Sequence, residues 1–273
     1  MSALTENFTL ANGITIPKIA FGTWQIPDGP TTYDSVTTAL KAGYRHIDTA
    51  RAYGNEASVG RAVRDSGIPR DEIFITTKLP AEIKDAGEVQ ASFEESSSLL
   101  DLGPVDLYLI HAPWPWSEMG KDCHTENIAV WKEMERLYQA GQVRSIGVSN
   151  FGVADLTSLI GGTDVRPHAN QIRWFIGHTQ DETTAFCKEN DILVEGYSPL
   201  STGKILDNPE VKQIADKYGK SVAQVCLRYL LEKDVLPLPK STTPSRITEN
   251  ADLDFSIAED DLKFLDGLVD TDA

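Results

Sequence analysis

Residues 106–112 read DLYLIHA, a short apolar run with a histidine directly before its last residue. Seven further runs of this kind, rich in β-branched residues, are distributed along the chain, at IAFGTW (19–24), RHIDTA (45–50), IFITTKL (73–79), SIGVSN (145–150), HANQIRW (168–174), LVEGYSPL (193–200) and VLPLPK (235–240). Longer segments with helical periodicity lie between them, for example TYDSVTTALKAG (32–43) and ENIAVWKEMERLYQAG (126–141). The runs are about 31 residues apart on average, which is the size of a βαβ unit.

Eight strands that alternate with helices predict a closed (β/α)8 TIM barrel. An open doubly wound sheet is disfavoured, because no Gly-rich GxGxxG turn follows the first strand. The stretch FTLANGITIP (8–17) predicts a β-hairpin that plugs the barrel floor, since alternating residues flank Asn12-Gly13, a type I′ turn sequence. The segment SIAEDDLKFLDGL (256–268) predicts an extra C-terminal helix outside the barrel. We expect residues 1–273 to form a single domain.

The composition excludes several classes of protein. The chain is 41% hydrophobic, which is enough for a large core and argues against a disordered or fibrous protein. No run approaches the roughly 18 apolar residues of a membrane span, and MSALTENFTL lacks the features of a signal peptide. The three cysteines are widely spaced and form no CxxC motif. We therefore expect a cytoplasmic protein without a disulfide framework or a metal site.

The formal net charge is −16, and such a surface repels nucleic acid and anionic lipid. We accordingly expect no nucleic-acid or membrane partner. We also expect a monomer. The charge does not exclude a small anionic ligand in a locally basic pocket.

Polar residues stand where the predicted strands end, and a barrel of this kind has its active site at the C-terminal ends of its strands. The residues in question are Asp48 followed by Tyr53, Lys78, His111, Ser149-Asn150, Asn170-Gln171, Tyr197-Ser198 and Lys240-Ser241. Taken singly, each has a structural explanation; Ser149-Asn150, for instance, could cap the next helix. Taken together, a tyrosine, a lysine, an aspartate and a histidine at one barrel mouth predict an active site.

Several ordered motifs carry a family resemblance. They are GYRHIDTARAYGNEASVG (43–60), ITTKL (75–79), LIHAP (109–113), RSIGVSNF (144–151), GYSPLSTG (196–203) and LPKSTTPSRITEN (238–250). Over residues 7–268 the chain resembles the aldo-keto reductases, in particular short bacterial members such as diketogluconate reductases. The resemblance implies that a nicotinamide cofactor reduces a small aldehyde, ketone or keto-sugar acid to an alcohol.

Such a reaction needs a proton donor and a group that stabilises the developing oxyanion. The resemblance implies that Tyr53 is the acid and that His111 donates to the carbonyl oxygen. A free phenol has a pKa near ~10, and a neighbouring cation lowers it. Lys78 can be that cation, and Asp48 would pair with Lys78 and compensate its burial. The chemistry requires no metal.

The resemblance further implies that NADPH lies across the barrel mouth. Its expected contacts are Ser149, Asn150 and Gln171 at the carboxamide, Tyr197 at the nicotinamide ring, Leu200 and Ser201 at the pyrophosphate, Lys240, Ser241 and Arg246 at the 2′-phosphate, and Glu249 and Asn250 at the adenine. Ser198 is also expected to bind the cofactor. Lys240 and Arg246 have an alternative explanation as solvated cations on a loop. The run LPKSTTPSR, with two cations and four hydroxyls in an acidic chain, favours an anion site.

The substrate pocket is expected to include Trp24, Ala112, Trp114 and Trp116. The family often has an aromatic residue directly after the histidine, where this chain has Ala112, and Trp114 and Trp116 are expected to rebuild that wall. The alternative is that the tryptophans belong to the core. The segment NQIRWFIGHTQ (170–180) also departs from the family motif after Gln171. Because the loop after Tyr197 is short, we expect an open pocket.

Two other functions are compatible with a barrel. One is a regulatory subunit that binds the cofactor without useful turnover, and the other is an unrelated phosphate-binding barrel enzyme. The complete set of Asp48, Tyr53, Lys78 and His111 favours the reductase over both.

Overall fold

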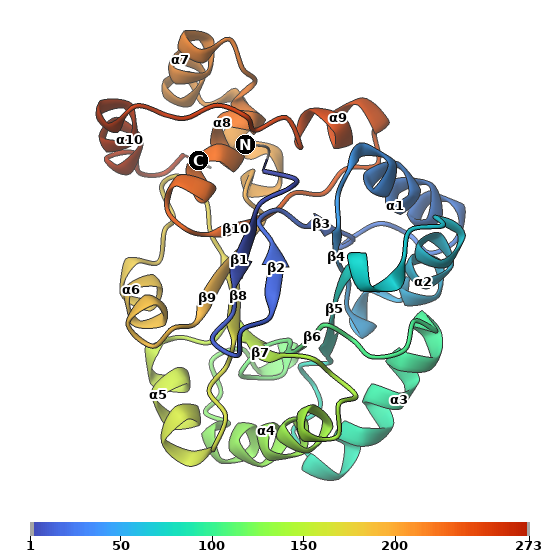
Figure 1. Ribbon diagram of the computed structural model, residues 1–273. Helices are drawn as coiled ribbons and strands as arrows, with labels where there is room; N and C mark the ends of the chain where they lie inside the picture. Colours follow the sequence, from blue (N-terminus) through green and yellow to red (C-terminus); the bar gives the residue numbers. More distant parts are fainter. Residues whose placement is uncertain (1–2, 272–273) are drawn as a thin grey trace.

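A ring of eight parallel strands forms the centre of the computed structural model, which describes residues 3–271 (Figure 1). The strands are β3 (Phe21–Gly22), β4 (His46–Asp48), β5 (Phe74–Leu79), β6 (Leu107–Ile110), β7 (Ile146–Ser149), β8 (Ala169–Arg173), β9 (Leu193–Tyr197) and β10 (Leu236–Leu238). Each pairs with the next in chain order. The backbone nitrogens of Ala20 and Gly22 donate to the carbonyls of Pro237 and Pro239 at 3.1 and 3.0 Å, which joins β3 to β10. The predicted (β/α)8 barrel is confirmed.

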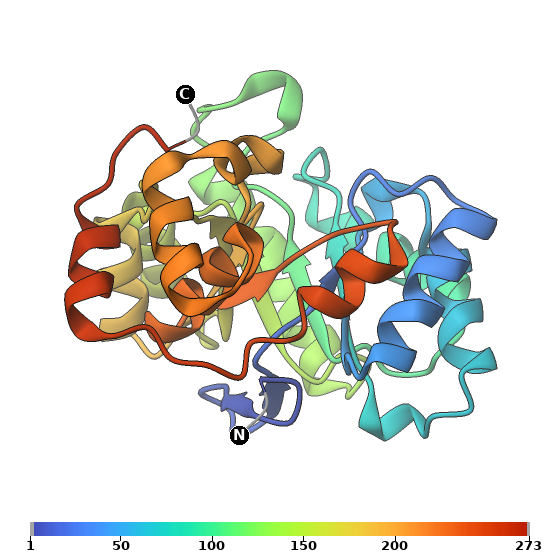
Figure 2. The ribbon, with the colours of Figure 1, turned by 90° about the horizontal axis from the view of Figure 1, so that it is seen from above.

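Helices surround this ring on the outside (Figure 2). They are α1 (Pro30–Ala42), α2 (Glu56–Asp65), α3 (Val89–Leu100), α4 (His124–Gln139), α5 (Val153–Gly162), α6 (Asp181–Glu189), α7 (Pro209–Tyr218), α8 (Val222–Glu232), α9 (Pro244–Glu249) and α10 (Glu259–Asp266). Helix α1 shows how the local sequence sets the bounds. Pro30 occupies its first position, and Gly43 ends it with a φ of 105°, a left-handed conformation that favours glycine.

The extra C-terminal helix, α10, is also confirmed. It begins at Glu259, three residues later than the expected Ser256. The backbone nitrogen of Ile257 instead donates to the Glu232 carboxylate at 3.3 Å, which holds the preceding segment extended against α8.

A hairpin of β1 (Asn7–Thr9) and β2 (Thr15–Pro17) lies across the centre of the ring at one end of the barrel (Figures 1 and 2). Ile16 and Leu10 are buried in one cluster with barrel residues, including Phe74 and Leu109. The hairpin therefore closes the barrel floor, as predicted.

The turn of this hairpin differs from the expected type I′. A type I′ turn needs a positive φ at both central residues, whereas only Gly13, at 83°, has one. The Gly13 nitrogen donates to Leu10 O at 2.8 Å, and the Leu10 nitrogen to Ile14 O at 2.9 Å. This is a three-residue loop with glycine in the left-handed position.

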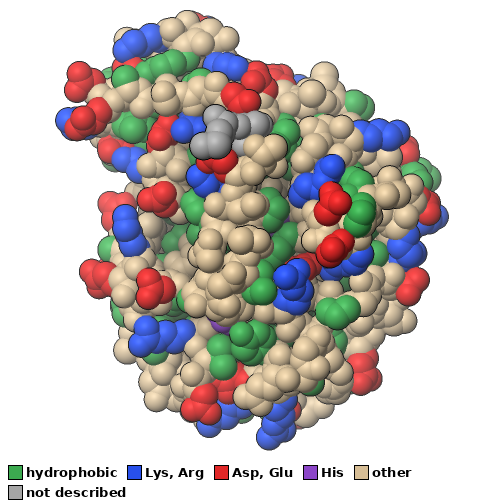
Figure 3. All heavy atoms as spheres, viewed as in Figure 1, with side chains coloured by type: hydrophobic (Ala, Val, Ile, Leu, Met, Phe, Trp, Pro, Cys, Tyr) green, Lys and Arg blue, Asp and Glu red, His purple; other side chains and the backbone are tan. Residues whose placement is uncertain are grey.

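A second, larger core lies between the strands and the helices, with buried members such as Trp131, Tyr108 and Ile172. Within residues 3–271, no helix combines the length and the apolar character that a membrane crossing requires. On the face that carries the hairpin, acidic and basic side chains are interspersed (Figure 3).

Candidate active site

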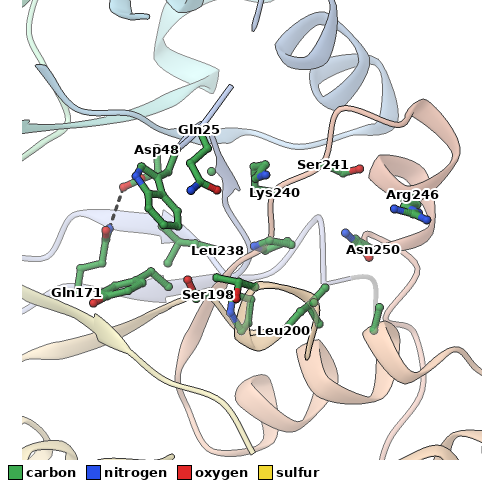
Figure 4. A pocket seen from close by; sticks show the side chains of 18 of the residues that line it. Gln25, Asp48, Gln171, Ser198, Leu200, Leu238, Lys240, Ser241, Arg246 and Asn250 are labelled. Atoms are coloured by element: carbon green, nitrogen blue, oxygen red, sulfur yellow. Dashed lines mark hydrogen bonds between the residues drawn. The ribbon is translucent and has the colours of Figure 1, made fainter. Parts of the chain in front are cut away.

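A cavity of about 960 Å³ lies at the C-terminal ends of the strands, opposite the hairpin. Most of the residues predicted for catalysis, cofactor and substrate line it. They are Trp24, Asp48, Tyr53, His111, Trp116, Ser149, Asn150, Gln171, Tyr197, Ser198, Leu200, Lys240, Ser241, Arg246, Glu249 and Asn250. Figure 4 shows part of this wall, from Gln171 and Asp48 at one end to Arg246 and Asn250 at the other. One continuous cavity thus joins the strand ends to the loop after β10.

Lys78 lies beneath the cavity and is fully buried. Its Nζ donates to Asp48 Oδ1 at 2.7 Å and to the Thr49 carbonyl at 2.8 Å. Neighbouring strands supply the pair, since β4 carries Asp48 and β5 carries Lys78. Burial is the largest single effect and lowers the pKa of Lys78, but Asp48 and Tyr53 together outweigh it and raise the lysine pKa above its ordinary value. Lys78 is therefore a cation at neutral pH.

Tyr53 ends a single 3₁₀ turn, Arg51–Tyr53, that follows β4. Gly54 terminates the turn with a φ of 68°, which directs the chain on into α2. The phenol ring lies with its centroid 5.0 Å from Lys78 Nζ. Burial raises the pKa of Tyr53 to about 12, and the charge of Lys78 lowers it by less than burial raises it. Tyr53 is therefore protonated at neutral pH, with its cation partner already in place.

His111 directly follows β6, and its ring lies between two aromatic side chains. The ring centroids of Tyr53 and Trp116 are each 5.5 Å away, in edge-to-face arrangements. Its Nδ1 is buried and has no hydrogen-bond partner within residues 3–271. Burial, reinforced by the charge of Lys78, lowers the pKa of His111 to about 3. The imidazole is therefore neutral at physiological pH.

A network of amides and hydroxyls forms the adjoining wall. Asn150, which has a φ of 62°, donates from Nδ2 to the His111 carbonyl at 3.1 Å and to Ser149 Oγ at 3.0 Å. The Tyr197 hydroxyl donates to Asn150 Oδ1 at 2.8 Å. Ser149 Oγ donates to the Gln171 carbonyl at 2.8 Å. The side chains of Ser149, Asn150 and Tyr197, at the ends of β7 and β9, are thereby held in fixed orientations.

Gln171 bonds in turn to two carboxyl groups. Its Nε2 donates to Asp48 Oδ2 and to Glu195 Oε2, each at 2.8 Å. Glu195 is fully buried, and sequence reasoning missed it. The signal was present, because a charged residue in the middle of the apolar run LVEGY is unusual in a buried strand.

The far end of the cavity is basic. Lys240 follows β10 after one residue, and Arg246 lies on α9. Both side chains are exposed, and neither forms an ion pair in the part of the chain that the structure describes. Ser241 and Asn250 lie on the same side of the cavity (Figure 4). These groups can bind an anionic portion of a ligand.

The comparisons with known proteins agree with this geometry. A sequence model of the Aldo/keto reductase family matches residues 18–270. This chain belongs to the aldo-keto reductase family. Glyoxal reductase of Bacillus subtilis (strain 168) is 40% identical over 268 residues, which cover 98% of this chain and 94% of the relative. A 9,11-endoperoxide prostaglandin H2 reductase of Trypanosoma cruzi (strain CL Brener) is 39% identical over an alignment that covers 95% of this chain and 90% of the relative.

Solved structures lead to the same family. An aldo/keto reductase from Brucella melitensis superimposes with a TM-score of 0.89 at 42% identity, covering 96% of this chain and 98% of the other. The aldo-keto reductase MGS-M4, from a Medee basin deep-sea metagenome library, superimposes with a TM-score of 0.91 at 36% identity. The superposition covers 98% of this chain and 96% of the other. The chain is therefore an oxidoreductase that acts on carbonyl groups, in a family that uses NADH or NADPH.

Two residues expected in the substrate pocket do not line the cavity of this reductase. Ala112 is fully buried, and its carbonyl accepts a hydrogen bond from Lys84 Nζ at 2.8 Å. Trp114 packs edge-to-face on Trp116, with centroids 5.2 Å apart. The wall is formed instead by Trp116 and Trp24, which are 39% and 45% exposed and so do not belong to the core.

Ser201, expected at the cofactor pyrophosphate, is also buried outside the cavity lining, where its Oγ accepts a hydrogen bond from Arg173. Sequence reasoning also missed several lining residues of the reductase. They are Gly22, Gln25, Ala52, Pro199, Thr202, Gly203, Leu206, Ser221, Val222, Ala223, Leu238 and Pro239. Thr202 and Gly203 belong to the quoted motif GYSPLSTG and could have been included on that ground. Ser221 and Val222 begin α8, and only the folded chain brings that helix to the barrel mouth.

Proposed function

We propose that this reductase uses NADPH to reduce a small aldehyde or ketone to an alcohol, with Tyr53 as the general acid. The observation that carries the proposal is the continuity of the cavity. It joins Tyr53 and His111 at one end to Lys240 and Arg246 at the other. An elongated ligand with a reactive head and an anionic tail matches this distribution of groups.

The polar groups of the cavity fit such a cofactor. Ser149, Asn150 and Gln171 line the nicotinamide end. The Gln171 amide oxygen is free there to accept a hydrogen bond from the NH₂ group of a carboxamide, because both hydrogens of Gln171 Nε2 bond to carboxyl groups. Lys240 and Arg246 are available for the 2′-phosphate, and a guanidinium can bind a phosphate in bidentate fashion. When bound, the nicotinamide supplies the hydride.

Tyr53 is suited to donate the proton. Its pKa of about 12 keeps the phenol protonated at neutral pH. Lys78 Nζ lies beside the ring and stabilises the phenolate that remains after proton transfer. Asp48 holds Lys78 in that place. His111, as a neutral imidazole fixed between two aromatic rings, can donate one hydrogen bond to the carbonyl oxygen and orient it.

The walls favour a neutral substrate. Trp24 and Trp116 present apolar surface at the catalytic end. Among the described residues that line the cavity, the cations are Lys240 and Arg246, which belong to the opposite end. A keto-sugar acid would therefore find no lysine or arginine at the catalytic wall for its carboxylate. The similarity to a glyoxal reductase also supports small aldehydes as substrates.

The test is the Tyr53→Phe variant, assayed with NADPH and glyoxal by the loss of cofactor absorbance. We expect kcat to fall by about 10²–10⁴-fold, the usual contribution of general acid catalysis. NADPH affinity, measured by fluorescence titration, should be retained. Tyr33→Phe is the matched control, because Tyr33 bonds to Asp65 outside the cavity. A near-native kcat in Tyr53→Phe would contradict the assignment of the acid, and a wild type inactive on a panel of aldehydes and ketones would contradict the function.

A further inference from the structure

Glu195 is a buried carboxyl group beside the candidate site that the mechanism above does not use. Strands β8 and β9 pair in register at Gln171 and Glu195, so both side chains leave the sheet on the same face. Because Gln171 lines the cavity, Glu195 also points into the barrel, where it has no exposed surface. Its Oε2 accepts a hydrogen bond from Gln171 Nε2 at 2.8 Å.

The amide of Gln171 is held from two sides. Its Nε2 has two hydrogens, and their acceptors are Asp48 Oδ2 and Glu195 Oε2. Figure 4 shows the bond to Asp48. If the amide turned over, its oxygen would face two carboxyl groups, which is unfavourable. The amide oxygen of Gln171 is therefore the atom left for a ligand in the cavity.

The charges around Glu195 are unbalanced. The charged groups that act on it are Asp48 of β4 and Lys78 of β5, and these two already form a pair. Its partners in register on the flanking strands, Gln171 and Leu236, carry no charge. Burial, and then the charge of Asp48, raise the pKa of Glu195 to about 7. Its Oε1 is buried and has no partner within residues 3–271, so this oxygen can carry the proton.

We propose that Glu195 is a positioning residue that fixes the orientation of the Gln171 amide. We further propose that the protonation state of Glu195 determines the strength of its hydrogen bond with that amide. This inference rests on the proposed function, in which Gln171 contacts the nicotinamide carboxamide. A carboxylate accepts a stronger hydrogen bond than a neutral carboxyl group. Loss of the proton from Glu195 therefore strengthens the hydrogen bond from the Gln171 amide, and protonation of Glu195 weakens it.

The first test needs no cofactor. The ¹⁵N side-chain amide resonance of Gln171, assigned by its absence in Gln171→Leu, is followed by NMR from pH 5.5 to 8.5. We expect it to titrate with a midpoint near pH 7 in the wild type. In Glu195→Gln, which preserves the side-chain size and an acceptor oxygen but cannot ionise, the titration should disappear. A titration that persists in this variant would overturn the proposal.

The second test measures NADH binding, because NADH lacks the 2′-phosphate that titrates in the same range. Glu195→Leu should raise the Kd for NADH about three- to tenfold, the effect of one lost hydrogen bond. The KM for the cofactor should rise more than kcat falls. Wild-type affinity should increase about two- to fivefold from pH 6 to pH 8, as the hydrogen bond becomes charge-assisted. Glu195→Gln should bind NADH with nearly wild-type affinity at pH 6 and show no such increase.

Glu56→Leu is the matched control. Glu56 is also a buried glutamate that accepts one hydrogen bond, from Thr77, and has one unpartnered oxygen in the described chain, but it does not line the cavity. We expect its NADH affinity to stay within about twofold of wild type. Equal weakening in Glu56→Leu and Glu195→Leu would indicate general destabilisation and overturn the proposal. If wild type binds no NADH or NADPH, the proposed function fails, and the NMR titration still decides whether Glu195 controls Gln171.

Discussion

Lys78 is a fully buried cation whose carboxylate partner, Asp48, is also buried. Lys78→Met removes one charge and leaves the other unpaired in the barrel, which destabilises a protein by about 3–5 kcal/mol. We expect a loss of this size in the free energy of unfolding, measured with urea. Adding Asp48→Asn should restore part of the stability, because the uncompensated charge is then gone.

Lys212→Met provides the comparison, since Lys212 and Asp216 form an exposed pair on α7. We expect this variant to unfold almost as the wild type does. A double variant, Lys78→Met with Asp48→Asn, that is no more stable than Lys78→Met alone would contradict the account of the buried pair.

The strand-end positions of Asp48, Lys78 and His111 could be predicted from chain order, because parallel strands in a barrel end on one face. The pKa values of the side chains in the site could not be predicted in this way. The expectation that Lys78 lowers the pKa of Tyr53 identified the direction of one effect, but burial is larger and raises that pKa to about 12. Burial depends on which side chains cover the phenol, and that is decided by the fold.

At the scale of elements, the hairpin closes the barrel floor and lies far from the cavity. Ile16 is fully buried in the floor cluster. Ile16→Ala should reduce the free energy of unfolding by about 2–5 kcal/mol, the range for a large-to-small change in a core. Because the cavity is at the other end of the barrel, the Kd for NADPH should change less than about twofold.

Ile14→Ala tests the same residue type in the same hairpin, where the side chain is only partly buried against the cluster. It should cost less stability than Ile16→Ala. An equal loss in both variants, or a large change in NADPH affinity for Ile16→Ala, would show that the hairpin does more than fill the floor.

The hairpin could be predicted from alternating residues around Asn12-Gly13, but its turn type could not. Asn12 Nδ2 donates to the Arg144 carbonyl at 3.1 Å and to Ser145 Oγ at 3.2 Å. These partners are more than a hundred residues away in the sequence, and only the assembled barrel places them beside the turn. The long-range bonds hold Asn12 in a conformation without the positive φ of a type I′ turn.

At the scale of the whole molecule, a chain with a net charge of −16 carries two exposed cations at one end of its cavity. The 2′-phosphate is the charged group that distinguishes NADPH from NADH, and a hydrogen bond to a charged group contributes roughly 1.5–3 kcal/mol. We therefore expect NADPH to bind at least about tenfold more tightly than NADH at low salt. Arg246→Ala should weaken NADPH much more than NADH, and added salt should narrow the wild-type difference.

The measurement is the Kd of both cofactors by fluorescence titration at two ionic strengths. Arg136→Ala is a suitable control, because Arg136 is an exposed arginine on α4 that does not line the cavity. Equal losses for NADPH and NADH in Arg246→Ala, or a native preference for NADH, would contradict the role of these cations.

The junction of β3 and β10 has a consequence for how the enzyme is made. The strands are two and three residues long and come from opposite ends of the chain. On the ribosome, β3 can pair with β4 early, but more than 200 further residues are synthesised before its other neighbour, β10, emerges. Contacts between such distant segments form late, because a long loop must close first. A nascent chain that lacks β10 is therefore an open sheet with bare edges at β3 and β9, the kind of edge on which other strands can add. Gly22 and Trp24 on one side of this junction, and Leu238 and Lys240 on the other, belong to the cavity wall. The pairing of β3 with β10 therefore covers the exposed edges of the sheet and also brings these parts of the cavity wall together.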